Sequence, residues 1–161
     1  MISVEVLLRH MAWSNQELYK EVQKLGNEVL DYYVIDPEWT VRKILVHIVG
    51  AGHLYGQRLD RKPFSPFKLE NDSDDVLIEQ LLIELERLDQ GLIKYANVDD
   101  GDLTYMTSQG ERTSKISTII SQMIFHAAEH RAQVVAALDK HNVRDINLDH
   151  YSVFGYIESL K

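Results

Sequence analysis

Residues 114–140, SKISTIISQMIFHAAEHRAQVVAALDK, predict a helix that carries both a packing face and a possible reactive centre. The apolar side chains that recur at helical spacing and mark its buried face are Ile116, Ile119, Met123 and Val134. His126 and His130 are four residues apart, so they point about 40° apart around the helix axis. Their β-carbons are expected to lie about 5–6 Å apart, which lets both imidazoles reach one metal ion. Both also fall on the apolar stripe.

Three earlier segments show the same periodicity, and each has a recognisable end. The first runs from about Ser3 to Leu25 and is followed by Gly26, a residue that commonly ends helices. The second starts at Thr40, a good N-cap residue, and continues to about Leu59. The third runs from near Asp74 to about Ala96 with a leucine stripe.

The segments that join and follow the predicted helices complete the predicted fold. Residues 61–73 contain two prolines and are long enough to cross from one end of a bundle to the other. The segment LTYMTSQGERT within residues 97–113 could hold a short hairpin, and residues 141–161 are expected to pack on the body through their apolar side chains. Four amphipathic helices in residues 1–161 therefore predict a single all-α domain, a four-helix bundle with a long crossover connection.

Composition removes several classes of function. The chain has 161 residues, a formal net charge of −8 and no cysteine, which excludes disulfides, a catalytic thiolate, thiolate zinc sites and iron–sulfur clusters. The basic residues are scattered, so no nucleic-acid partner is expected. No run of about 18 apolar residues predicts a membrane span, and no signal peptide is recognised at the N-terminus. A cytoplasmic location is the default expectation.

A third ligand is needed for a histidine metal site, and His47 is the candidate. It lies on the predicted apolar face of the second helix, three residues past Ile44. Three core-facing histidines on two helices predict a site of three imidazoles, which leaves coordination positions open, as in catalytic metal sites. The alternative is that these are core or edge histidines with ordinary hydrogen-bond partners. His53 lies about 240° around the helix from His47 and cannot share its direction.

The remaining histidines are expected in surface or packing roles: His10, His141 and His150. Two polar neighbours of the histidine pair have an open interpretation. Gln133 shares their helix face and could hydrogen-bond a ligand imidazole, or it could be a core amide bonded to the backbone or to a partner subunit. Glu129 completes the pattern H-x-x-E-H of inverted zinc proteases, in which it would be the general base, or it is a solvated surface carboxylate.

These motifs together resemble the DinB-like (DinB/YfiT) superfamily. HMAWSN (residues 10–15) is similar to the family's first-helix segment, LVHIVGAGHLYGQRL to its second helix with the first metal histidine, and FHAAEHRAQ to its closing H-x-x-x-H-R-G-Q signature. Ala132 stands where the family usually has glycine, and this removes no ligand. Arg131 and Gln133 also match motif positions, and no catalytic role is assigned to either.

The resemblance implies a four-helix bundle, often a homodimer, that holds a divalent metal, commonly nickel or zinc, through His47, His126 and His130. The family name records induction by DNA damage in some members. Some relatives are thiol S-transferases that join a low-molecular-weight thiol to a small electrophile, so the first hypothesis is a metal-dependent enzyme of that kind. The alternative is a non-catalytic metal- or small-molecule-binding homodimeric bundle, or a metal-dependent hydrolase.

Overall fold

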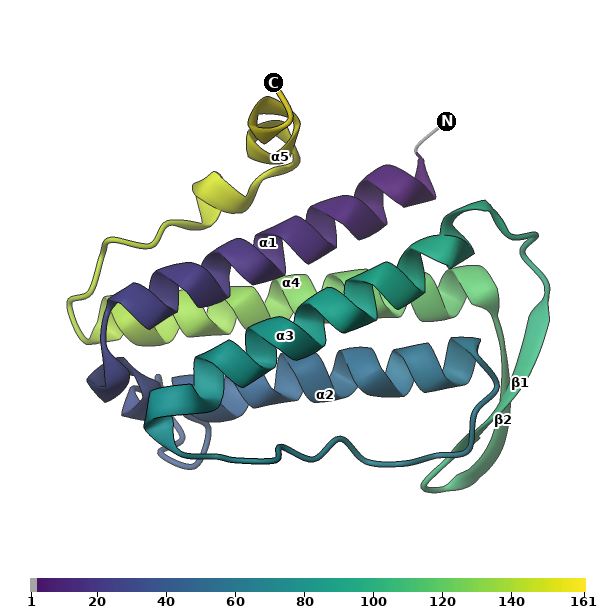
Figure 1. Ribbon diagram of the computed structural model, residues 1–161, viewed down its shortest axis with the longest axis horizontal. Coiled ribbons are helices and arrows are strands. Elements are labelled where there is room, and N and C mark those ends of the chain that lie inside the picture. The colour runs from purple at the N-terminus through teal and green to yellow at the C-terminus, as the bar shows by residue number, and fades with distance from the viewer. Residues whose placement is uncertain (1–2) are drawn as a thin grey trace.

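The computed structural model describes residues 3–161, and this part of the chain is mostly helical, with five α-helices and one two-stranded antiparallel sheet (Figure 1). The four long helices are α1 (Val4–Lys24), α2 (Val41–Leu59), α3 (Asp74–Leu92) and α4 (Ile116–Lys140). The shorter elements are η1 (Asn27–Asp31), η2 (Ile93–Asn97), β1 (Asp102–Thr107), β2 (Gly110–Lys115), η3 (Leu148–Tyr151) and α5 (Val153–Ser159). All four predicted helices are present. The predicted all-α class is incomplete only because it leaves out the two-stranded sheet.

The long helices pack in the order α1, α3, α2, α4 around one core, since α1 contacts α3 and α4, and α2 contacts the same two helices. Figure 1 shows that α1 and α4 run in one direction and α2 and α3 in the other. The segment between α2 and α3 returns along the full length of the helices, which is the long crossover expected for residues 61–73. The crossover makes α2 and α3 parallel neighbours.

The start of α2 is fixed by side-chain and backbone hydrogen bonds. The Thr40 hydroxyl accepts a hydrogen bond from the Lys43 backbone N–H at 3.4 Å, which satisfies one free donor of the first turn. The Val41 N–H donates to the Tyr32 carbonyl at 2.8 Å. Gly26, at φ +95°, allows the chain to turn after α1. These contacts place the segment before α2, including Trp39, against the helix ends.

The predicted hairpin is confirmed as β1 and β2, paired from Asp102↔Lys115 to Thr107↔Gly110. Leu103 anchors it in the core, with 2% of its surface exposed. The tail packs on the body through Tyr151, whose carbonyl oxygen accepts hydrogen bonds from His10 Nε2 (2.7 Å) and the Ser14 hydroxyl (3.3 Å).

The tail packs on the body as expected, although two of its apolar side chains take no part in that packing. Tyr151 and Tyr156 are buried, but Phe154 is 85% exposed and Ile157 is exposed as well. The reason is that α5 is short and turns one face toward α1, and within residues 3–161 its other face is open to solvent. Within residues 3–161, the helices are too short or too polar to span a bilayer.

The leucine stripe of α3 is expected to be a main source of stability. Leu81 is fully buried, so Leu81→Ala should lower the free energy of unfolding by about 2–5 kcal/mol, through lost burial and the cavity left behind. Ile83 lies on the same helix and is 59% exposed, so Ile83→Ala should change the free energy of unfolding by only about 0.5 kcal/mol. Urea titration of both variants measures the difference. Equal losses would contradict the assigned core face of α3.

Candidate metal centre

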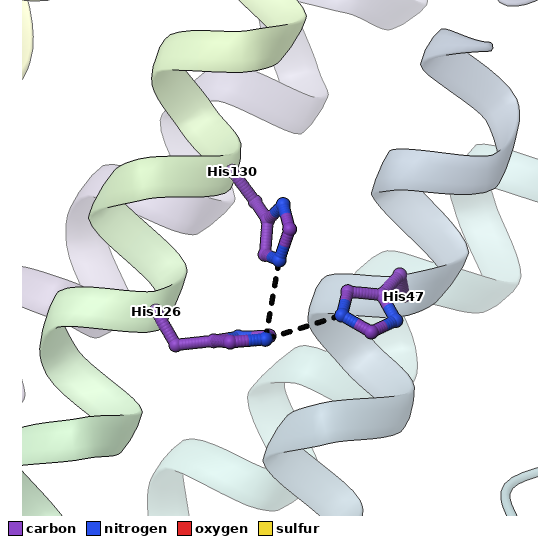
Figure 2. Close-up of side chains that lie close together, drawn as sticks. All are labelled: His47, His126 and His130. Atoms are coloured by element: carbon purple, nitrogen blue, oxygen red, sulfur yellow. Dashed lines mark hydrogen bonds between the residues drawn. The ribbon is translucent and has the colours of Figure 1, made fainter. Parts of the chain in front are cut away.

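Three histidine side chains converge between α2 and α4, as Figure 2 shows. His47 comes from α2, and His126 and His130 come from successive turns of α4. The Nε2 atom of His126 lies 3.1 Å from Nε2 of His47 and 3.1 Å from Nε2 of His130. The ligand atoms of the three rings all lie within 4.8 Å of one another. The structure thus brings together the three residues that the sequence selected.

The burial of these rings differs from the expectation that they face the core. His126 and His130 are half-buried, and His47 is exposed. The residues directly after two of them, Ile48 and Ala127, point about 100° away around their helices and enter the core. The histidines therefore lie along the edge of the α2–α4 contact, where the apolar face of each helix gives way to solvent, and the cluster is open to small molecules.

The spacing of the nitrogens fits one metal ion. Two nitrogen ligands at about 2.0–2.1 Å from zinc, separated by about 90–110°, lie about 2.9–3.4 Å apart. The two 3.1 Å separations at His126 fall in this range. All three rings direct the same type of atom, Nε2, into the shared space.

Hydrogen bonds alone do not account for both short separations. Nε2 of His126 carries at most one hydrogen, yet it faces two other Nε2 atoms at the same distance. If the rings are neutral and the Nε2 hydrogen of His126 points at one of these two atoms, the contact of His126 Nε2 with the other atom lacks good hydrogen-bond geometry. A cation among the three lone pairs satisfies all of them at once, so the donor set suits a divalent metal.

Gln133 fixes the orientation of one ring. Its side-chain oxygen lies 2.8 Å from Nδ1 of His130 and accepts a second hydrogen bond from Nε1 of Trp39 at 3.0 Å. An amide oxygen only accepts, so the hydrogen of His130 lies on Nδ1 and its Nε2 lone pair points at the cluster. Of the two interpretations left open for Gln133, the structure supports the one in which it holds a candidate ligand.

Aromatic rings enclose the cluster on both sides. The Trp39 ring packs edge-on against His47 and His130, with centroid distances of 5.3 and 5.8 Å. The Tyr55 ring lies 5.9 Å from that of His126 on the other side. Burial raises the pKa of the Tyr55 hydroxyl, which keeps its hydrogen near neutral pH. The rings limit water around the histidines without closing the site.

The surroundings favour neutral imidazoles. Partial burial, followed by the neighbouring imidazoles of His130 and His47, lowers the pKa of His126 to about 4. Burial and His130 also lower the pKa of His47. Neutral rings are the form that binds metals, so these two residues are available as ligands at neutral pH without first losing a proton.

The other candidates lie outside the cluster. Glu129 is exposed and belongs to the solvent face of α4. The three histidines expected in surface or packing roles have them: His10 bonds the Tyr151 carbonyl, His141 stacks on Tyr32 at 4.1 Å, and His150 is exposed. His53 contacts Gln57 at 2.7 Å.

The sequence analysis missed Trp39. The available signal was its position directly before the N-cap Thr40 and eight residues before His47, which places it beside the first turn of the helix that carries that histidine. Its contact with Gln133 spans 94 residues, and this pairing could not be read from either segment alone.

Fold and site together define a mostly helical protein with a cluster of three histidines that could hold a metal ion. The model of the DinB family matches residues 1–152, and the chain belongs to that family. The match includes all of the helices that supply the cluster and confirms the resemblance noted in the sequence. No curated protein sequence matches the chain.

The lowered pKa of His126 predicts how acid affects the metal-free protein. The unfolded chain takes up a proton on this histidine near pH 6.5, whereas the folded chain does so only near pH 4, so stability should fall as the pH drops between these values. In His126→Asn this part of the decline should disappear. Denaturant titrations of both proteins at several pH values in this window measure the difference. Parallel curves for the two proteins would contradict the pKa assignment.

Gln133 should affect metal binding without being a ligand. Gln133→Leu removes the acceptor that holds His130 Nδ1–H, and loss of such a partner typically weakens metal affinity about 10–100-fold. Competition with a chelator of known affinity measures this change. Gln90→Leu is the control, because Gln90 is an exposed residue of α3 bonded to Glu86. Equal affinity of Gln133→Leu and wild type would show that the hydrogen bond does not orient the ring.

Proposed function

We propose that this DinB-family protein binds one divalent metal ion through His47, His126 and His130 and acts as a metal-dependent thiol S-transferase. The observation that carries the metal site is the convergence of three Nε2 atoms, with His126 3.1 Å from both partners. The hydrogen bond from His130 Nδ1 to Gln133 supports it, because this contact leaves Nε2 of that ring free to act as a ligand.

A divalent ion in this site supplies Lewis acidity and lowers the pKa of a thiol or water bound to it. Three protein ligands leave room for such a molecule, and the exposure of His47 gives it a route from solvent. Imidazole ligands suit nickel or zinc, the two metals that we propose. The surrounding residues orient the ligands and exclude part of the water: Gln133 holds His130, and Trp39 covers two of the rings.

The thiol is proposed to be an external low-molecular-weight compound. The chain has no cysteine, so the sulfur nucleophile of a transferase of this kind cannot be one of its own side chains. The second substrate is a small electrophile that accepts the sulfur.

The finer features of the expected family architecture belong to the same proposal. The four long helices are proposed to form a single four-helix-bundle domain with the crossover at residues 61–73, to assemble as a homodimer and to work in the cytoplasm. The non-catalytic metal-binding protein and the metal-dependent hydrolase are the competing functions, and the two experiments below separate them.

Metal content tests the site itself. Protein purified without a tag or chelator should contain about one nickel or zinc ion per chain, and His126→Ala should lose it, because two imidazoles bind these ions far more weakly than three. His53→Ala provides a matched control on α2, since His53 contacts Gln57 and not the cluster. Elemental analysis measures all three proteins. Wild type that neither contains metal nor takes up added nickel or zinc would overturn the proposed site.

Transferase activity tests the chemistry. Metal-loaded protein should accelerate the reaction of cysteine, used as a simple thiol, with 1-chloro-2,4-dinitrobenzene, and His47→Ala should return the rate to that of the uncatalysed reaction. The absorbance of the thioether product measures the rate. Full metal occupancy with only background rates for a panel of thiols would favour the non-catalytic protein. Acceleration of ester hydrolysis without thiol transfer would favour the hydrolase.

A further inference from the structure

An apolar groove with a volume of about 420 Å³ lies next to the candidate metal centre. We call it the 34–39 groove, because one wall is the segment of residues 34–39 that leads into α2 and the other is the C-terminal half of α4. The apolar residues that line it are Val34, Ile35, Trp39, Ile44, Ala132 and Ala136. The side chain of Ile35 is 88% exposed at the groove, so residues 3–161 leave most of this apolar side chain uncovered.

The groove and the metal centre share a wall. Trp39 and Gln133 line the groove, and the same two residues contact the histidines: Gln133 accepts from His130, and the Trp39 ring packs against His47 and His130. A molecule in the groove therefore lies against residues that touch the candidate ligands.

The size of the groove indicates a small molecule. Ligand pockets commonly have volumes of about 300–1,000 Å³, whereas a stable protein partner contacts about 20–30 residues on each side. Eight residues line this groove, too few to form such an interface by themselves.

The polar groups of the lining disfavour an anionic ligand. Gln133 uses its oxygen for Trp39 and His130, and Asp36 accepts a hydrogen bond from the Glu38 N–H at 2.9 Å. Asp36 is the one ionisable residue of the lining, and its negative charge, like the net charge of −8, disfavours an anion. The rest of the surface offers apolar contact to an aliphatic or aromatic group.

We propose that the 34–39 groove binds the uncharged apolar body of the small-molecule electrophile, whose reactive end reaches the three histidines. This inference rests on the proposed function and adds the chemical class of the substrate to it. The site then discriminates between substrates by their apolar part, through contacts with Trp39, Ile35 and Ala136.

Two chelators that differ only in their apolar body test the proposal. Octanohydroxamic acid and acetohydroxamic acid have the same metal-binding end, and calorimetry with the metal-loaded protein compares their affinities. We expect octanohydroxamic acid to bind at least about tenfold more tightly, which corresponds to the burial of about two methylene groups. Ala136→Glu places a charge in the groove from an exposed helix position and should remove this preference. Ala128→Glu, also exposed on α4 but outside the groove, should retain it.

Octan-1-ol with metal-free protein separates failure of the groove from failure of the metal site. It should bind wild type and Ala128→Glu saturably and Ala136→Glu at least about tenfold more weakly. If wild type binds octanol but does not take up added nickel or zinc, the groove is supported and the metal centre is overturned. Equal affinities of the two hydroxamic acids, or equal octanol binding by the two glutamate variants, would overturn the groove. Conversion of a dimer to a monomer by Ala136→Glu, with no chain-length preference in wild type, would assign the groove to self-association instead.

Discussion

The packing of α2 against α4 is the interaction on which the rest of the site depends. It joins residues that are 79 positions apart, His47 and His126, and brings their Nε2 atoms to 3.1 Å. Ile44 and Ile48 on one helix, and Met123 and Ala127 on the other, are buried on either side of the histidines. The hydrophobic contact thus holds the two backbones at a fixed distance, and the imidazoles occupy the edge of an interface that forms without them. The apolar contacts on either side of the histidines thus hold the three rings within reach of one another.

A second buried contact joins α4 to α1. Arg131, directly after His130, is 5% exposed and donates a hydrogen bond to the Asn15 side-chain oxygen of α1 at 2.6 Å. Burial lowers the pKa of this guanidinium to about 10, so it still carries its charge at neutral pH. These two adjacent residues point about 100° apart around the helix and have separate contacts. His130 faces the other histidines of the cluster, and Arg131 ties the same helical turn to the HMAWSN segment of α1 (residues 10–15).

Much of this arrangement follows from the sequence. Helical periodicity placed the four long helices, Thr40 marked the start of α2, and histidine spacing selected the cluster. Burial was predicted less well, because a helical stripe gives the average direction of a face and not the boundary where it meets solvent, which is where the histidines lie. The partners of Gln133 could not be predicted, since the indole of Trp39 reaches it only after the segment before α2 folds against α4. The exposed face of α5 escaped prediction for a related reason: an apolar residue packs only if another element covers it.

The hydrogen bond from Trp39 to Gln133 has a consequence for observing this protein in solution. The chain contains two tryptophans, and Trp13 lies against Tyr156 of α5, where its ring has no part in the histidine cluster. Trp39 shares its amide acceptor with His130 and touches two of the imidazoles, so its indole senses the charge and position of these rings. In a Trp13→Phe background, tryptophan fluorescence comes from Trp39 alone, and the protein carries its own optical reporter beside the histidine cluster.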